Sequence, residues 1–185
     1  MEIDKDFYNF LKEYKIDLTE EDIFEMFKMR RRFPHQFHDT VPSLEVINSY
    51  DGQSQHRGIF DAQGFLEYGK VKKAYELGHT LILSSIFDLT DDLRMLESVI
   101  SDRFAFYPVH GNLYMSKEGK GGFQSHDHTY DVYVKQIYGT SYWVLGETES
   151  VTVRPGDVIH IPSFTKHYVD ETDGPRLSLT INMQW

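Results

Sequence analysis

The residues best suited to chemistry in this sequence are histidines. Two of them lie two positions apart in the segment "GGFQSHDHTYDVYVKQIYG", residues 121–139. Residues two apart on an extended strand project from the same face, so His126 and His128 point together while Asp127 points away. Imidazole nitrogens bind divalent iron, zinc, nickel and copper, but a pair of ligands on one strand needs a third from elsewhere.

A later motif offers the third ligand. The segment "RPGDVIHIPSFTKHYV", residues 154–169, has a strand–turn–strand pattern that leads to His167. A His-x-His pair followed by Pro-Gly-Asp, a proline and a histidine is far more restrictive than a lone histidine pair. The competing interpretation is that these are surface histidines of a chain that has 9 of them. We favour a metal site formed by His126, His128 and His167.

Short strands are predicted to position these histidines. From about residue 109 the apolar residues alternate with a period of two, interrupted by Gly, Pro and charged residues. This pattern is typical of an antiparallel sandwich or barrel. The expected strands are 110–116, 124–128, 131–137, 141–147, 149–154, 157–161, 165–170 and 176–184.

The first part of the chain is predicted to be helical and to pack outside the sheet. Helices are expected over 4–14 behind the cap Asp4, from the capping box at Thr19 onward, over 64–77, and from Thr90 to about 103. A buried strand is expected at 80–86, and residues 33–64 follow no regular pattern. We therefore expect a mainly β fold in a single structural domain, with a helical region over 1–77 and a barrel over 78–185.

Composition excludes several classes of function. The 185 residues carry a formal net charge of −10, which disfavours binding to nucleic acid or to an anionic membrane surface. The one dense basic run, Arg30–Arg32, is interpreted as a solvated helix end. The absence of cysteine excludes disulfides and thiolate chemistry. No signal peptide or membrane-length apolar run is found, so we expect a cytoplasmic protein.

Two segments resemble a known family. "SHDHTYDVYVKQIYGTSYWVL" and "VRPGDVIHIPSFTKHYVDETDGPRLSLTINMQW" look like the cupin fold, and are most similar to JmjC-type oxygenases such as ribosomal oxygenases and asparaginyl hydroxylases. "GHTLILSSIFDLTDDLRMLESVISDRF" is similar to the segment that precedes the barrel in that family. The resemblance covers roughly residues 75–185, and Gly156, Asp157, Pro162 and His167 fall in register.

The resemblance implies a double-stranded β-helix (a cupin or jelly-roll barrel) that holds Fe(II), for which Zn, Ni, Co or Mn can substitute, and that uses 2-oxoglutarate to hydroxylate a C–H bond. The family's metal motif is His-x-Asp or His-x-Glu, whereas here His128 stands in place of the acid. Three neutral imidazoles leave the metal its full charge, which changes its redox potential and its affinity for an anion.

The resemblance also implies residues for the co-substrate. The family's Lys or Arg fifteen residues after the first ligand is Ser141 here, and alternation turns the nearby Lys135 outward. Arg176 is the better clamp for a carboxylate. Other pocket residues implied by the resemblance or by alternation are Ser178, Asn182, Tyr114 and Ser116, with Asp131 near the metal as a residue able to orient a ligand imidazole.

Three functions remain open at this point. The first is a 2-oxoglutarate-dependent oxygenase acting on a small molecule, a peptide or a protein side chain. The second is a three-histidine metallo-cupin, a dioxygenase or isomerase that does not use 2-oxoglutarate. The third is a non-catalytic cupin that binds a ligand. Barrels of this kind commonly form homodimers, which the sequence leaves open.

Overall fold

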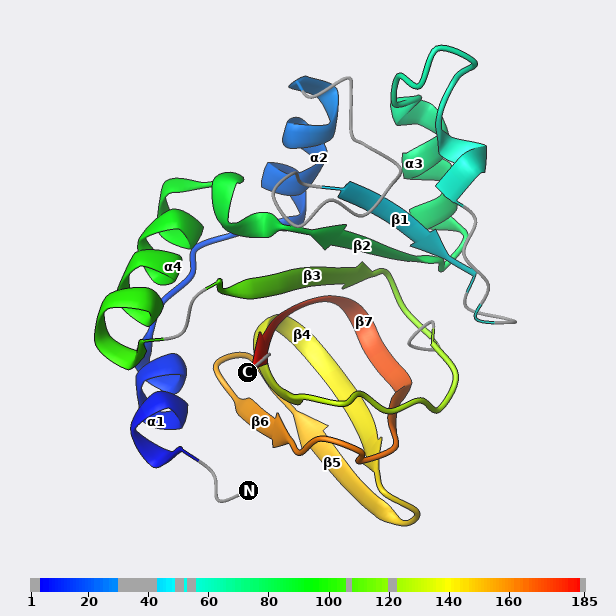
Figure 1. Cartoon of the computed structure of the whole chain (residues 1–185). Helices are drawn as coiled ribbons and strands as arrows, with labels where there is room; N and C mark the ends of the chain where they lie inside the picture. The colour runs from blue at the N-terminus through cyan, green and yellow to red at the C-terminus, as the bar shows by residue number, and fades with distance from the viewer. Residues whose placement is uncertain are drawn as a thin grey trace.

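A rolled antiparallel sheet forms the centre of the molecule (Figure 1). The computed structural model describes residues 4–29, 43–48, 52, 56–105, 108–119 and 123–183. Seven strands hydrogen-bond in the order β1-β2-β3-β7-β4-β5, and β6 pairs with β4. The strands are β1 (Ser43–Ile47), β2 (Thr80–Ser84), β3 (His110–Ser116), β4 (Asp131–Leu145), β5 (Glu149–Val153), β6 (Val158–Ile161) and β7 (His167–Met183).

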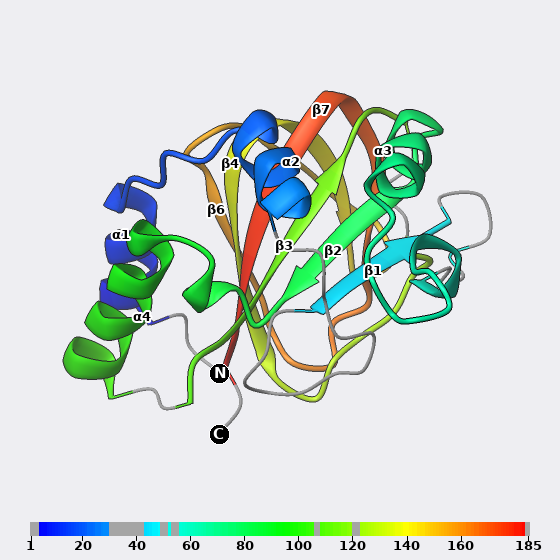
Figure 2. The same cartoon turned by 90° about the horizontal axis from the view of Figure 1, so that it is seen from above.

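Four α-helices of the described residues lie outside this sheet, and Figure 2 shows α2 and α3 over β2 and β3, with α1 and α4 side by side at one end. They are α1 (Lys5–Glu13), α2 (Glu20–Met29), α3 (Tyr68–Glu76) and α4 (Asp91–Phe104). The short 3-10 turn η1 (His56–Ile59) lies between β1 and α3, and η2 (Ile86–Asp88) lies between β2 and α4. The predicted caps form: Asp4 accepts from the backbone of Asp6 and Phe7, and Thr90 accepts from Leu93. No helix in the described part of the chain is both long and apolar enough to cross a membrane.

The alternation of side chains along β7 separates the core from the site. Leu177, Leu179 and Ile181 are fully buried in the large apolar cluster that also contains the helix residues. The alternate residues of β7 face the interior of the barrel, where a second, smaller cluster includes Val134 and Trp143. The barrel interior is therefore free to carry polar groups, because the helices on the other face supply most of the apolar burial.

The predicted limits of several strands were wrong, because two pairs of predicted strands are each one continuous strand. The two strands predicted at 131–137 and 141–147 fall on the single strand β4 (Asp131–Leu145). Those predicted at 165–170 and 176–184 fall on the single strand β7 (His167–Met183), as far as the described residues extend. Gly139 has φ +71°, and the β4–β7 register shifts beside it, so this glycine makes a bulge rather than ending the strand. Segment 124–128 is not a strand: it pairs at one point only, between His126 and His167.

The N-terminal region is also less purely helical than predicted. Strand β1 lies in the stretch expected to be irregular and pairs with β2, across the expected boundary between residues 77 and 78. Helix α3 begins at Tyr68 rather than at residue 64. The division into two regions stays a prediction, and Arg30–Arg32 lies outside the described residues.

Candidate metal centre

The three predicted imidazoles meet at one mouth of the barrel. His126 and His128 come from the loop before β4, and His167 is the first residue of β7. The ring centroids lie 4.5 Å apart for His126 and His167, 5.0 Å for His126 and His128, and 5.1 Å for His128 and His167. One nitrogen from each ring lies within 4.8 Å of the others. A small side-chain movement would bring all three within bonding distance of one ion, about 2.0–2.1 Å.

Backbone hydrogen bonds fix the orientation of two of the rings. His126 and His167 pair through their main chains, N to O at 3.2 Å and 2.8 Å. The Nδ1 atom of each ring lies next to the carbonyl oxygen two residues earlier: that of Gln124 at 2.9 Å and that of Thr165 at 2.8 Å. A carbonyl can only accept, so Nδ1 carries the proton and Nε2 keeps its lone pair for a metal.

The electrostatics of the site favour neutral imidazoles. Burial, together with the neighbouring His126 and His167, lowers the pKa of His128 to about 4. Burial likewise lowers the pKa of His167, against the Thr165 carbonyl, which raises it. The unprotonated ring is the form that binds a metal, so the lowered pKa values favour the metal-binding form of His128 and His167 at neutral pH.

A cavity of about 60 Å³ leads from the histidines into the barrel. Aromatic and aliphatic side chains form the walls beside the rings, and polar side chains of β3 and β7 form the inner end. The residues that line it are Asn112, Tyr114, Phe123, His126, His128, Tyr130, Val132, Val134, Trp143, Ile161, His167, Tyr168, Val169, Arg176, Ser178, Thr180 and Asn182.

The inner end of the cavity holds a buried guanidinium. Arg176 is 1% exposed, and burial lowers its pKa to about 10, so the group remains a cation at neutral pH. Its Nε donates to Ser116 Oγ at 2.9 Å and its Nη1 to Ser178 Oγ at 3.2 Å. Burial, with a smaller effect of Tyr130, raises the pKa of the neighbouring Tyr114 to about 12, so its hydroxyl stays protonated. The cavity thus joins a metal-ligand set at one end to a cation at the other.

The remaining predicted residues divide between the cavity wall and its supports. Tyr114, Ser178 and Asn182 line the cavity, whereas Ser116 lies behind Arg176 and bonds it. Ser141 is fully buried, and its hydroxyl points to Gln136 rather than into the cavity.

Asp131 is engaged away from the three imidazoles. Its Oδ2 lies 2.8 Å from His160 Nε2, and its Oδ1 accepts from the backbone of Ser163 at 2.9 Å. Burial would raise the Asp131 pKa, but these two bonds lower it below its ordinary value. Asp131 thus supports the loop before His167 and orients no ligand ring directly.

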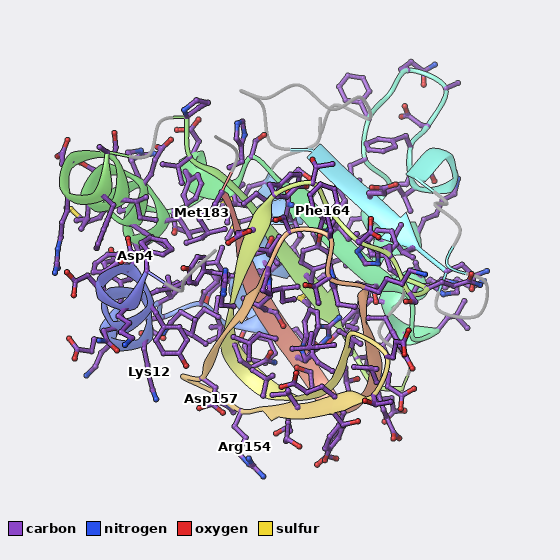
Figure 3. All side chains as sticks on the ribbon, turned by 60° about the horizontal axis from the view of Figure 1, so that its bottom comes forward. Asp4, Lys12, Arg154, Asp157, Phe164 and Met183 are labelled. Atoms are coloured by element: carbon purple, nitrogen blue, oxygen red, sulfur yellow. The ribbon has the colours of Figure 1, made fainter. Side chains whose placement is uncertain are left out.

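This loop also supports His128. The backbone N–H of Phe164 donates to the His128 carbonyl at 2.7 Å. Phe164 has φ +61°, a conformation rarely adopted by residues other than glycine, and its ring is 70% exposed. Figure 3 shows Phe164 at one end of β6, opposite the turn that carries Asp157 and Arg154.

Sequence reasoning missed two residues of the site. Gln136 is fully buried within the barrel, and Phe123 stands 5.3 Å from the His126 ring. Alternation from Val132 and Val134 places Gln136 on the inner face of the barrel, so the sequence pattern could have identified this residue. No such pattern identifies Phe123, because it lies in a loop. Trp143 also lines the cavity, and its ring stacks on that of His167 with centroids 6.3 Å apart.

Comparisons with known proteins match one segment of the chain to a domain family and most of the chain to a solved fold. Residues 83–152 match the JmjC domain family. The ribosomal oxygenase YcfD from Escherichia coli, solved with cobalt and succinic acid, is 14% identical and shares the fold over 94% of this chain and 46% of its own, with a TM-score of 0.58. The present chain therefore spans less than half the length of that oxygenase.

Two cupin structures match a smaller share of the chain. A cupin-like protein from Thermotoga maritima is 14% identical over 58% of this chain and 70% of its own, with a TM-score of 0.39. A cupin superfamily protein from Desulfitobacterium hafniense is 17% identical over 42% and 69%, with a TM-score of 0.36. No curated protein matches the chain. The chain therefore shares a double-stranded β-helix with external helices, the fold class that the sequence predicts, and one segment of it matches the JmjC domain.

Proposed function

We propose that this chain is a metal-dependent oxygenase that uses 2-oxoglutarate to hydroxylate a C–H bond of a small molecule, a peptide or a protein side chain. One oxygen atom of O2 enters the substrate, and the other enters succinate as 2-oxoglutarate loses CO2. The observation that carries the proposal is that one cavity holds three converging imidazoles at one end and the buried Arg176 at the other.

The donor set fits a divalent metal. His126, His128 and His167 would hold Fe(II) through ring nitrogens, and burial lowers the pKa of His128 and His167, which favours their metal-binding form. Bound iron would supply the electrons that activate dioxygen. Trp143 and Phe123 pack beside these rings and limit the access of water to them.

The opposite end fits a carboxylate. A guanidinium offers a planar pair of N–H donors, and a charge-assisted bond in a buried cavity is stronger than one between neutral groups. Arg176 would bind the distal carboxylate of 2-oxoglutarate, while Tyr114 and Asn182 offer polar groups on neighbouring strands. The deprotonated co-substrate would also offset the positive charge that three neutral ligands leave on the metal.

The test measures succinate released from 2-oxoglutarate by purified, iron-loaded protein in air. We expect turnover that a chelator abolishes and that Arg176→Met reduces at least tenfold through a higher KM for 2-oxoglutarate. Replacement of Arg154, an exposed residue in the turn before β6, is the matched control and should leave turnover unchanged. If iron-loaded protein neither binds nor consumes 2-oxoglutarate, the proposal fails.

His128 supports a second candidate. A third imidazole in place of a carboxylate suits a metallo-cupin that oxidises or isomerises a small molecule without a keto acid. The same preparation distinguishes the two, because metal-dependent oxygen uptake that is indifferent to 2-oxoglutarate and to Arg176→Met would favour the second. A cytoplasmic setting and a homodimer remain part of the proposal and are tested by fractionation and by the mass in solution.

A further inference from the structure

A buried amide connects the two ends of the cavity. Gln136 lies on β4 and is 0% exposed. Its Oε1 accepts from Ser178 Oγ at 2.8 Å and from Ser141 Oγ at 3.1 Å. Its Nε2 donates to the backbone oxygen of Tyr138 at 2.8 Å. Both lone pairs of the amide oxygen are therefore used, one by each hydroxyl.

The groups at the two ends of this hydrogen-bond network determine which atom donates and which accepts in every bond. The Tyr138 carbonyl can only accept, so the amide nitrogen must face it and the amide oxygen must face the two serines. Arg176 can only donate, so Ser178 accepts from Arg176 and gives its own proton to Gln136. No other arrangement satisfies all of these groups at once.

The second arm follows the same logic. Trp143 Nε1 donates to Ser141 Oγ at 3.0 Å, so Ser141 also gives its proton to Gln136. Trp143 in turn stacks against the His167 ring. A continuous set of bonds thus runs from the indole beside the metal ligands, through Gln136, to the guanidinium.

We propose that Gln136 is a positioning residue for the anion-binding end of the site: it sets the polarity of Ser178 and thereby holds the Arg176 guanidinium in the orientation that binds a carboxylate. The ligand in this inference, a keto acid with a distal carboxylate, rests on the proposed function. The effect of Gln136 on the orientation of Arg176 does not rest on the proposed function, because it follows from the hydrogen bonds alone.

The expected defect of Gln136→Leu is selective. Without its acceptor the Ser178 hydroxyl can turn its proton elsewhere, and Arg176 loses a fixed partner while keeping its charge. The affinity of iron-loaded, oxygen-free protein for 2-oxoglutarate should fall roughly tenfold, the effect of about one buried hydrogen bond to a charged group. Pyruvate offers the metal the same keto acid but lacks the distal carboxylate, so its affinity should change less than twofold.

Two further measurements separate positioning from general damage to the core. Ser141→Ala removes the hydrogen bond between Ser141 and Gln136 but leaves the one between Ser178 and Gln136. The affinity for 2-oxoglutarate should therefore stay within twofold of the wild type. Arg176 donates to Ser178 through Nη1 and to Ser116 through Nε, so a guanidinium that loses its fixed partner at Nη1 can also turn away from Ser116. In ligand-free protein, the Nε–H signal of Arg176, assigned by its loss in Arg176→Lys, should therefore exchange with solvent faster in Gln136→Leu. Gln136→Met, which keeps the length of the side chain, should reproduce both effects if Gln136→Leu does not fold.

Equal weakening of 2-oxoglutarate and pyruvate, or an unchanged Arg176 Nε–H signal, would overturn the inference. Failure of the proposed function has a different signature, because wild-type protein would then bind neither keto acid. In that case the exchange of the Arg176 Nε–H still decides whether Gln136 holds the guanidinium.

Discussion

At the scale of the residue, the candidate site depends on which imidazole nitrogen carries the proton. His126 and His167 each direct Nδ1 to a backbone carbonyl two positions earlier, and this shared arrangement leaves both Nε2 atoms for a ligand. His128 is held differently, since its ring stacks on Tyr130 with centroids 5.0 Å apart and planes at 8°. The three rings are thus oriented before any metal binds.

Replacing one of these candidate ligands should lower metal affinity without unfolding the barrel. We expect His167→Ala to lower metal affinity by at least about 100-fold, because two imidazoles cannot replace a set of three. The measurement is metal content after dialysis, beside the thermal midpoint of unfolding. His110→Ala is the matched control, since this half-buried residue on β3 lies outside the cavity lining. Equal metal content in the two variants would contradict the ligand assignment.

At the scale of the element, the close approach of β4 to β7 places Arg176. The bulge at Gly139 brings the β4 backbone against Pro175 and Arg176 of β7. A Cβ on Gly139 would overlap the Pro175 carbonyl oxygen and would lie 2.8 Å from Arg176 Cα. The small residue is required there by both the left-handed backbone and the contact.

Gly139→Ala should therefore destabilise the protein by about 3 kcal/mol or more, because backbone atoms cannot move aside as a flexible side chain can. Gly174→Ala is the control: Gly174 also has a positive φ, 76°, but no atom lies within 4 Å of its Cβ position. Its cost should stay near 1 kcal/mol, the strain of the backbone alone. Urea unfolding measures both, and similar losses in the two variants would argue against the contact.

At the scale of the whole molecule, the helices and the barrel are tied by a buried lysine. Lys135 faces away from the cavity, as alternation predicts, and is 4% exposed beneath α1. Its Nζ donates to the carbonyls of Leu11 at 2.8 Å and Lys12 at 3.2 Å, near the C-terminal end of α1. A cation is favourable at that end of a helix, but burial lowers the lysine pKa.

This burial makes stability depend on pH. The unfolded chain keeps the ordinary lysine pKa of about 10.4, while the folded chain has a lower one. Between the two values the unfolded state binds more protons, so wild-type stability gains a contribution as pH rises through that interval. Lys135→Met lacks this contribution, so the stability of the wild type relative to Lys135→Met should rise toward pH 10.5. Urea unfolding from pH 7 to 10.5 measures it; a constant difference would refute the linkage.

Much of this molecule can be predicted from the sequence. Single residue types predict the helix caps at Asp4 and Thr90. Alternation of apolar and polar residues with a period of two predicts the mainly antiparallel architecture and the inner face of β7. The convergence of the two motifs follows from their resemblance to a family with a known barrel. The strand limits do not follow, because Gly139 and Gly174 read as turns when their strand partners are unknown.

The sequence by itself determined the candidates for the chemistry: three histidines at restrictive spacing and an arginine on the same strand face as Asn182. Only the tertiary structure decided their environment. Burial of the His128 and His167 rings, the engagement of Asp131 with His160, and the amide network around Gln136 all depend on neighbours far apart in the chain. The spacing of residues along a strand specifies which face of the sheet each side chain lies on. The pKa of a side chain and the direction of its hydrogen bonds depend on every group that packs against that side chain in the fold.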